Sequence, residues 1–178
     1  MCDFVRSIRA KATFFTLLNR EPKIIRDLIS IFSSSPYLGG IIASRPELID
    51  NFMYRQQALQ ANDFNSLLEA LTERKLLSKI ISAGQFIQHQ NVAELTDNLS
   101  STADEICLTL LSELKKQFEA SCVQILCLGK WGGRELGLRS DLDFIFVTPQ
   151  TPNSDDHKVA KRFLSRLSDQ HKGGQLYH

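Results

Sequence analysis

The sequence lacks the features that would place it in a membrane or outside the cell. No run approaches the roughly 18 apolar residues that a membrane-spanning helix needs. The N-terminus has no uninterrupted apolar core, because Asp3, Arg6, Arg9 and Lys11 are scattered through it, whereas a secretory signal places its charges ahead of such a core. We therefore expect a cytoplasmic protein.

Cysteine and histidine are also scarce. The four cysteines and four histidines are dispersed along the chain. None has the close spacing of a zinc site or of a CxxC redox motif, so the sequence shows no His/Cys metal cluster.

An excess of charge of one sign is missing as well. Lys and Arg together number 21 and Asp and Glu number 20, so no overall field would hold a nucleic acid or an anionic membrane. We expect neither as a partner, and any phosphate contact must come from a local cluster. With 43% hydrophobic and 23% charged residues, the composition is that of an ordinary globular protein.

The first 120 residues have helical periodicity. Apolar side chains recur at helical spacing in several segments, and Ser33–Pro36 ends the first of them. Asp104 and Glu105 are expected near the start of the last segment, where they would complement the helix dipole. Arg74, Lys75 and Lys79 are expected on a solvated helix face. The predicted helices are 22–32, 37–43 (interrupted by Gly39 and Gly40), a helix starting at 46, 64–81 and 100–118.

The pattern changes near Ser121. Residues 123–128 and 142–147 are short apolar runs that predict strands of a sheet covered on both faces. A polar linker at 149–156 then leads to a helix with one apolar face, and Gln175–His178 resembles the start of another strand. The expected fold class is α+β.

The residues between the two predicted strands carry the chemistry. Asp141 and Asp143 are two positions apart at the start of the second strand, so both carboxylates leave the same face, roughly 7 Å apart. Such a pair can hold Mg²⁺, which binds few protein carboxylates and keeps its other positions for water and substrate phosphate. A turn acceptor or a solvated strand end is the alternative explanation of this pair.

The segment Gly129–Ser140, called the glycine loop below, provides the groups that a phosphate needs. Gly129, Gly132 and Gly133 would let the backbone approach a phosphate and point N–H groups at it. Local positive charge comes from Lys130 and Arg134. Each feature alone has a structural explanation, since glycines form turns, cations lie at surfaces and Trp131 suits a core. Ser140 could donate a hydrogen bond to the phosphate or to the adjacent carboxylate.

The motif GKWGGREL, followed by SDLDFIF, resembles the signature of the glutamine synthetase adenylyltransferase/adenylyl-removing enzyme family. The segments FTLLNREP, SSPYL with RPELID, and GQLY are similar to family segments in the same order. The resemblance implies a helical N-terminal region, 1–119, packed on a truncated polymerase-β-like nucleotidyltransferase sheet, 120–178. It differs in Trp131, where leucine is usual, and in Arg139, where a small polar residue is commoner.

The resemblance implies a function for the whole enzyme, namely Mg²⁺-dependent transfer of AMP from ATP to a tyrosine of glutamine synthetase, which regulates nitrogen metabolism. It assigns Asp141 and Asp143 as catalytic metal ligands. Glutamine synthetase and a PII-type regulatory protein are the expected partners. The form of the motifs favours the C-terminal, adenylylating copy of the domain. The ATP-binding residues would be Gly129, Lys130, Gly132, Gly133, Arg134 and Ser140.

Two further hypotheses stay open. One is the deadenylylating copy or another nucleotidyltransferase of the same superfamily, and the other is a non-catalytic relic that binds a partner. In the family a third carboxylate follows on a later strand, and we expect it just beyond His178. This chain alone is therefore expected to have little or no transferase activity.

Overall fold

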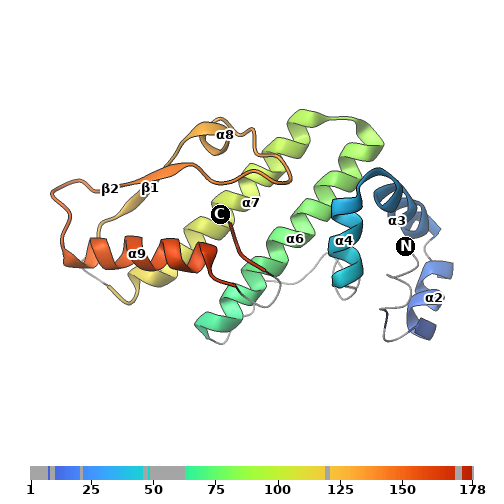
Figure 1. The fold of residues 1–178 in the computed structure, drawn as a ribbon, viewed down its shortest axis with the longest axis horizontal. Helices are drawn as coiled ribbons and strands as arrows, with labels where there is room; N and C mark the ends of the chain where they lie inside the picture. Colours follow the sequence, from blue (N-terminus) through green and yellow to red (C-terminus); the bar gives the residue numbers. More distant parts are fainter. Residues whose placement is uncertain are drawn as a thin grey trace.

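A computed structural model of the chain describes residues 8, 11–20, 22–45, 48, 63–118, 121–170 and 174–177. Most of these residues are helical, and two short strands form one small sheet (Figure 1). This is consistent with the α+β class. The elements in chain order are α2 Lys11–Arg20, α3 Pro22–Ser34, α4 Pro36–Ser44, α6 Phe64–His89, α7 Val92–Lys115, β1 Gln124–Cys127, α8 Gly129–Gly132, β2 Phe144–Val147 and α9 Ser154–Ser168.

The junction of α3 and α4 lies where the sequence predicts a stop. Ser35 is extended, and its Oγ accepts the N–H of Leu38 at 3.3 Å, so it caps α4. The predicted interruption at Gly39 and Gly40 is wrong, because α4 runs through both residues. A Cβ at Gly39 would lie 2.9 Å from Cδ1 of Phe32. Gly39 therefore allows α3 and α4 to pack closely instead of ending a helix.

Helices α6 and α7 form a long hairpin at the centre of the molecule (Figure 1). Gln90 ends α6 in the left-handed conformation, with φ of 55°, and the Asn91 side chain then caps α7. Because α7 begins at Val92, the expectation that Asp104 and Glu105 lie near its start is wrong. Both residues lie in the middle of the helix, where they bind other parts of the chain.

Strands β1 and β2 pair antiparallel, with Leu126 opposite Ile145. One face of this sheet packs on α9, where Phe163 meets Phe144 and Phe146 edge to face at 5.8 and 5.7 Å between ring centroids. The other face is open, since Leu126 and Ile145 are 50% and 47% exposed. The expectation of a sheet covered on both faces is thus not met among the described residues.

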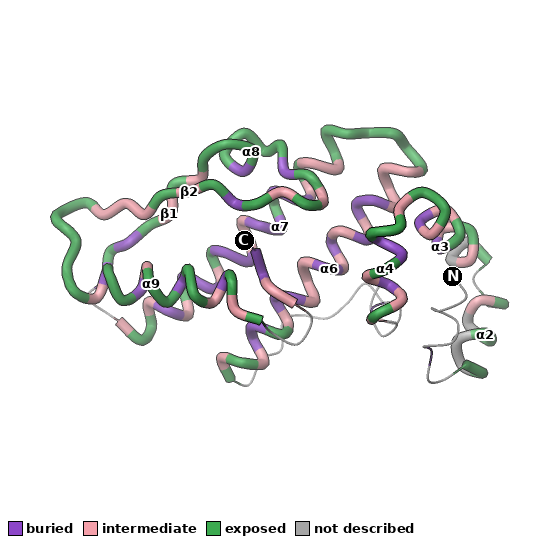
Figure 2. Tube along the Cα trace, in the orientation of Figure 1, coloured by how far each residue is buried: buried purple, intermediate pink, exposed green. Residues whose placement is uncertain are grey.

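Two clusters of buried side chains hold these elements together, and the residues that are buried are marked along the chain in Figure 2. The smaller joins α3, α4 and α6, and the larger joins α6 and α7 to the sheet, the glycine loop and α9. The larger cluster includes residues on both sides of position 119, and the domain division expected there stays a prediction. Within the described segments, none of the helices has the length and apolar character needed to cross a membrane.

The last described residues, 174–177, bend back onto the core and do not form the predicted strand. Leu176 is completely buried, and the N–H of Tyr177 donates to the carbonyl of Leu167 at 3.0 Å. His178, the last residue of the predicted strand, lies outside the described residues. So does the helix predicted from Pro46, except Leu48, which is helical and buried.

Candidate active site

The two candidate metal ligands lie just before β2. Asp141 and Asp143 are exposed, whereas Leu142 between them is buried. This alternation places both carboxylates on the open side of the sheet, because successive side chains of an extended chain point to opposite faces. Among the described residues, neither carboxylate accepts a hydrogen bond or forms an ion pair. Both are free to bind a ligand.

The start of the glycine loop lies against Asp143. Gly129 has a φ of +53°, and a Cβ built on it would lie 2.6 Å from Oδ2 of Asp143. The N–H of Leu128 also donates to the carbonyl of Asp143 at 2.8 Å. Glycine is therefore required at position 129 by both its backbone conformation and its contact with Asp143.

A short helix that the sequence did not predict, α8, occupies the first part of the glycine loop. The N–H groups of Gly132 and Gly133 donate to the carbonyls of Leu128 and Gly129, both at 2.9 Å. The expectation that these two N–H groups face a phosphate is not met, because they already have acceptors. A Cβ at Gly132 would lie 2.6 Å from the carbonyl oxygen of Cys127, so this glycine serves the close packing of α8 on β1.

Arg134 was expected to add positive charge for a phosphate, but its guanidinium binds α7 instead. Nη1 lies 3.1 Å from Oδ2 of Asp104, and Nε pairs with Oδ1 of Asp97. Nη2 donates to the hydroxyl of Ser101. These hydrogen bonds raise the pKa of Arg134, with Asp97 contributing most and Asp104 next. The charge of Arg134 therefore holds the glycine loop against α7.

Trp131 strengthens the same attachment. Its ring is buried and meets Phe144 edge to face, with centroids 5.8 Å apart. Its Nε1–H donates to Oδ1 of Asp104 at 2.8 Å. Asp104 thus binds two residues of the glycine loop at once. Sequence reasoning missed this role because Asp104 precedes Trp131 by 27 residues and carries no local signal in mid-helix.

The remaining candidate residues of the glycine loop differ in their contacts. Lys130 is exposed and has no ion pair with any described residue. The Oγ of Ser140 accepts the N–H of Gly137 at 2.9 Å, which closes the last turn of the loop. Because that oxygen acts as an acceptor, the hydroxyl hydrogen of Ser140 stays available for donation.

A third aspartate, Asp156, was predicted only as part of a linker. It is 4% exposed, and it accepts hydrogen bonds from the Asn153 N–H at 2.9 Å, the Ser121 hydroxyl at 2.9 Å and the Cys122 N–H at 2.8 Å. These bonds, that from Asn153 first, hold its pKa below the ordinary value. Asp156 therefore joins α9 to the residues that lead into β1.

The donor set suits a hard divalent cation better than zinc. In the part of the chain that the structure describes, no three His, Cys, Asp or Glu residues gather into a metal cluster. Two exposed carboxylates on one face are a fit for Mg²⁺, which takes one or two carboxylates and completes its shell with water and substrate phosphates. Asp141 and Asp143 are the residues that would hold it.

Comparison with known proteins agrees with the motif. The family described as glutamate-ammonia ligase adenylyltransferase matches residues 74–172, and the chain belongs to this family. It is 28% identical to the bifunctional glutamine synthetase adenylyltransferase/adenylyl-removing enzyme of Neisseria meningitidis serogroup A, over 99% of this chain and 23% of that protein. The enzyme of the same name from Burkholderia mallei is 23% identical, over 98% of this chain and 22% of its own length. The chain thus spans less than a quarter of these relatives.

Proposed function

We propose that the chain carries the metal-binding and nucleotide-binding part of an adenylyltransferase active site. The whole enzyme would transfer AMP from ATP to a tyrosine of glutamine synthetase. One observation supports this most directly. Asp141 and Asp143 are exposed on one side of the chain at the start of a strand and have no partner among the described residues, and Asp143 lies against the turn at Gly129.

The residues have separate tasks in this proposal. Asp141 and Asp143 hold Mg²⁺, which when bound neutralises triphosphate charge and aligns the attacking and leaving oxygens. Gly129, without a side chain, lets the backbone turn lie directly against Asp143 without striking its carboxylate. Lys130 is an exposed cation of the glycine loop that is available for the nucleotide, while Arg134 holds the loop to α7.

Calorimetry with ATP and Mg²⁺ tests the binding part of the proposal. We expect weak, Mg²⁺-dependent binding by this chain and its loss in the double variant Asp141→Asn/Asp143→Asn, which keeps the shape of both side chains. Glu113→Gln is the matched control, because Glu113 is a carboxylate of α7 that pairs with the neighbouring Lys116. Equal heats from the wild type and the double variant would remove the aspartate pair from the site.

The direction of the reaction needs the full-length enzyme. Labelled ATP with unmodified glutamine synthetase tests adenylylation, and phosphate with adenylylated glutamine synthetase tests removal of AMP by phosphorolysis. The Asp141→Asn/Asp143→Asn variant should lose at least about 100-fold in whichever rate this domain provides. If both rates persist in the variant, the domain is a non-catalytic module.

A further inference from the structure

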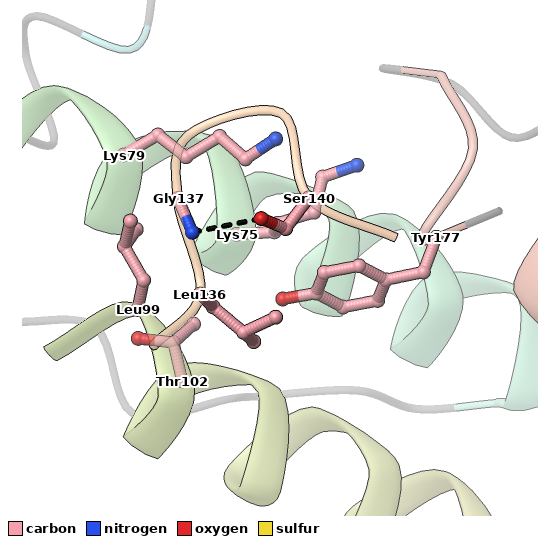
Figure 3. Close-up of a pocket in the computed structure, with 8 residues that line it drawn as sticks. All are labelled: Lys75, Lys79, Leu99, Thr102, Leu136, Gly137, Ser140 and Tyr177. Atoms are coloured by element: carbon pink, nitrogen blue, oxygen red, sulfur yellow. Dashed lines mark hydrogen bonds between the residues drawn. The ribbon is translucent and has the colours of Figure 1, made fainter. Parts of the chain in front are cut away.

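A small pocket has Ser140 in its lining but neither Asp141 nor Asp143. It is formed by α6, α7, the second half of the glycine loop and the last described residue, Tyr177 (Figure 3). Its volume is about 10 Å³, which is room for about one water molecule. Two lysines of α6, Lys75 and Lys79, line it beside Gly137 and Ser140.

Lys75 does not lie on a solvated face, as the sequence predicted, but is half-buried. Its ammonium donates to the carbonyl of Leu176 at 2.7 Å and to that of Gln175, and it lies 5.4 Å from the centroid of the Tyr177 ring. Two of its three hydrogens therefore have backbone acceptors. The charge itself has no carboxylate partner among the described residues.

Two more cations gather beside it around the ring of Tyr37. The ammonium of Lys79 and the guanidinium of Arg139 lie 5.9 and 5.5 Å from the ring centroid. A contact of this kind contributes only about 0.5–1 kcal/mol at an exposed site. Neither cation has an ion pair within the described ranges. Arg139, an unusual residue at its position in the motif, thus joins the two lysines of α6.

Ser140 adds a hydrogen-bond donor to these cations. The hydroxyl of Ser140 retains its hydrogen for donation, because its oxygen is already the acceptor for Gly137. Burial, and then the charge of Lys79, lower the pKa of Lys75 to about 8. The two lysine charges thus repel each other, and a bound anion would relieve that repulsion.

We propose that Lys75, Lys79, Arg139 and Ser140 form a subsite for a small phosphate-type anion. The pocket is too small to enclose such an anion, so the anion lies across its mouth, where the long side chains of Lys79 and Arg139 can reach it. Asp141 follows Ser140 directly, which places this subsite next to the proposed nucleotide site without sharing its carboxylates. The ligand is either a free phosphate or pyrophosphate, or the terminal phosphates of a nucleotide.

The chain itself, without added metal, provides the test. Titrations with inorganic pyrophosphate, inorganic phosphate and ATP, followed by calorimetry, would be compared for the wild type and for Lys79→Met, Arg139→Met and the double variant. We expect each single variant to weaken binding about tenfold and the double variant to abolish it. Lys161→Met is the matched control, because Lys161 is an exposed lysine of α9 with no described partner.

These titrations test the subsite independently of the Asp141 and Asp143 carboxylates. Loss of pyrophosphate or phosphate binding in the Lys79 and Arg139 variants identifies a free anion as ligand, and loss of ATP binding alone identifies nucleotide phosphates. Unchanged binding in these variants, or an equal loss in Lys161→Met, would overturn the subsite. The Asp141→Asn/Asp143→Asn variant should keep metal-free pyrophosphate binding even if the proposed transferase function fails.

Discussion

The two faces of the β1–β2 sheet hold aspartates in opposite circumstances. Next to the packed face, Asp156 is buried and accepts three hydrogen bonds from the chain around it. On the open face, Asp141 and Asp143 are exposed and accept none from the described residues. A carboxylate whose acceptor positions are filled stabilises the fold, whereas one without partners is available for a ligand.

The side chains of the glycine loop also divide into those that bind the rest of the chain and those that are exposed. Trp131 and Arg134 on one side are bound to Asp97 and Asp104 of α7, and Lys130 on the other side is exposed without a described partner. Positive charge next to glycines is therefore not by itself a sign of phosphate binding. The role of a cation in this loop depends on whether it binds a carboxylate elsewhere in the chain. For Arg134 the carboxylates belong to α7, which is distant in the sequence.

Replacement of Asp156 should have the largest effect on stability. Asp156→Ala leaves three donors, those of Asn153, Ser121 and Cys122, without their acceptor and separates α9 from the start of β1. In thermal unfolding, Asp156→Ala should lower the Tm more than replacement of Gly129, Asp104 or Asp143 does. Asp155→Ala is the control, since Asp155 has an exposed i,i+3 pair with Lys158. Equal drops in the two variants would contradict the structural role.

The Asp156 carboxylate should also make the stability of the fold depend on pH in the acid range. The folded-state pKa of Asp156 lies below its ordinary value of 3.8, so just below that value the unfolded chain binds more protons than the folded chain. The stabilisation is present above the ordinary pKa and is lost as the pH falls through the folded-state pKa. Urea unfolding should therefore show a larger stability difference between wild type and Asp156→Ala at about pH 7 than at about pH 3. If the stability difference between wild type and Asp156→Ala did not change with pH, the ionised Asp156 carboxylate would not be its cause.

Replacement of Gly129 should have the next largest effect on stability. Gly129→Ala forces a side chain into the left-handed region and against the Asp143 carboxylate, which should lower the free energy of unfolding by about 1–3 kcal/mol. Gly133→Ala, whose Cβ would come no closer than 3.4 Å to its neighbours, should change it by no more than about 0.5 kcal/mol. Chemical unfolding of both variants checks the pair, and equal losses would contradict the geometry.

Replacement of Asp104 tests the attachment of the glycine loop to α7. Asp104→Ala leaves the buried Nε1–H of Trp131 without its acceptor, at a cost of about 1–3 kcal/mol. Because Trp131 is the single tryptophan of the chain, its emission maximum should shift to longer wavelength. Asp97→Ala removes an exposed ion pair with Arg134, so it should cost about 0.2–1 kcal/mol and leave the emission unchanged. The reverse order of effects would overturn this assignment.

Replacement of Asp143 should affect stability least. Asp143→Asn removes a charge that has no described partner, so the free energy of unfolding should stay within about 0.5 kcal/mol of the wild type, while Mg²⁺-dependent ATP binding is lost. A large drop in Tm would show that Asp143 has a structural role like that of Asp156. Circular dichroism melts alongside the calorimetry described above separate the two roles.

The sequence predicted what local patterns determine. The helices that became α3, α6 and α9 follow from apolar periodicity, and the two strands follow from short apolar runs. The role of Asp104 could not be predicted, because the residues around it in mid-helix give no indication that it binds Trp131, 27 positions later. The open face of the sheet was missed for a related reason. Leu126 and Ile145 are apolar whether or not anything covers them, so their identity does not report their exposure.

The attachment through Asp104 has a mechanical consequence. Helix α7 has 24 residues, so it is a rod about 36 Å long at 1.5 Å per residue, bound by one end to the α6 turn and near its middle to Trp131 and Arg134. The indole and the guanidinium are thus anchored to a long rod that is itself packed along α6. The position of the glycine loop beside the strand therefore depends on the same helix pair that forms the centre of the molecule.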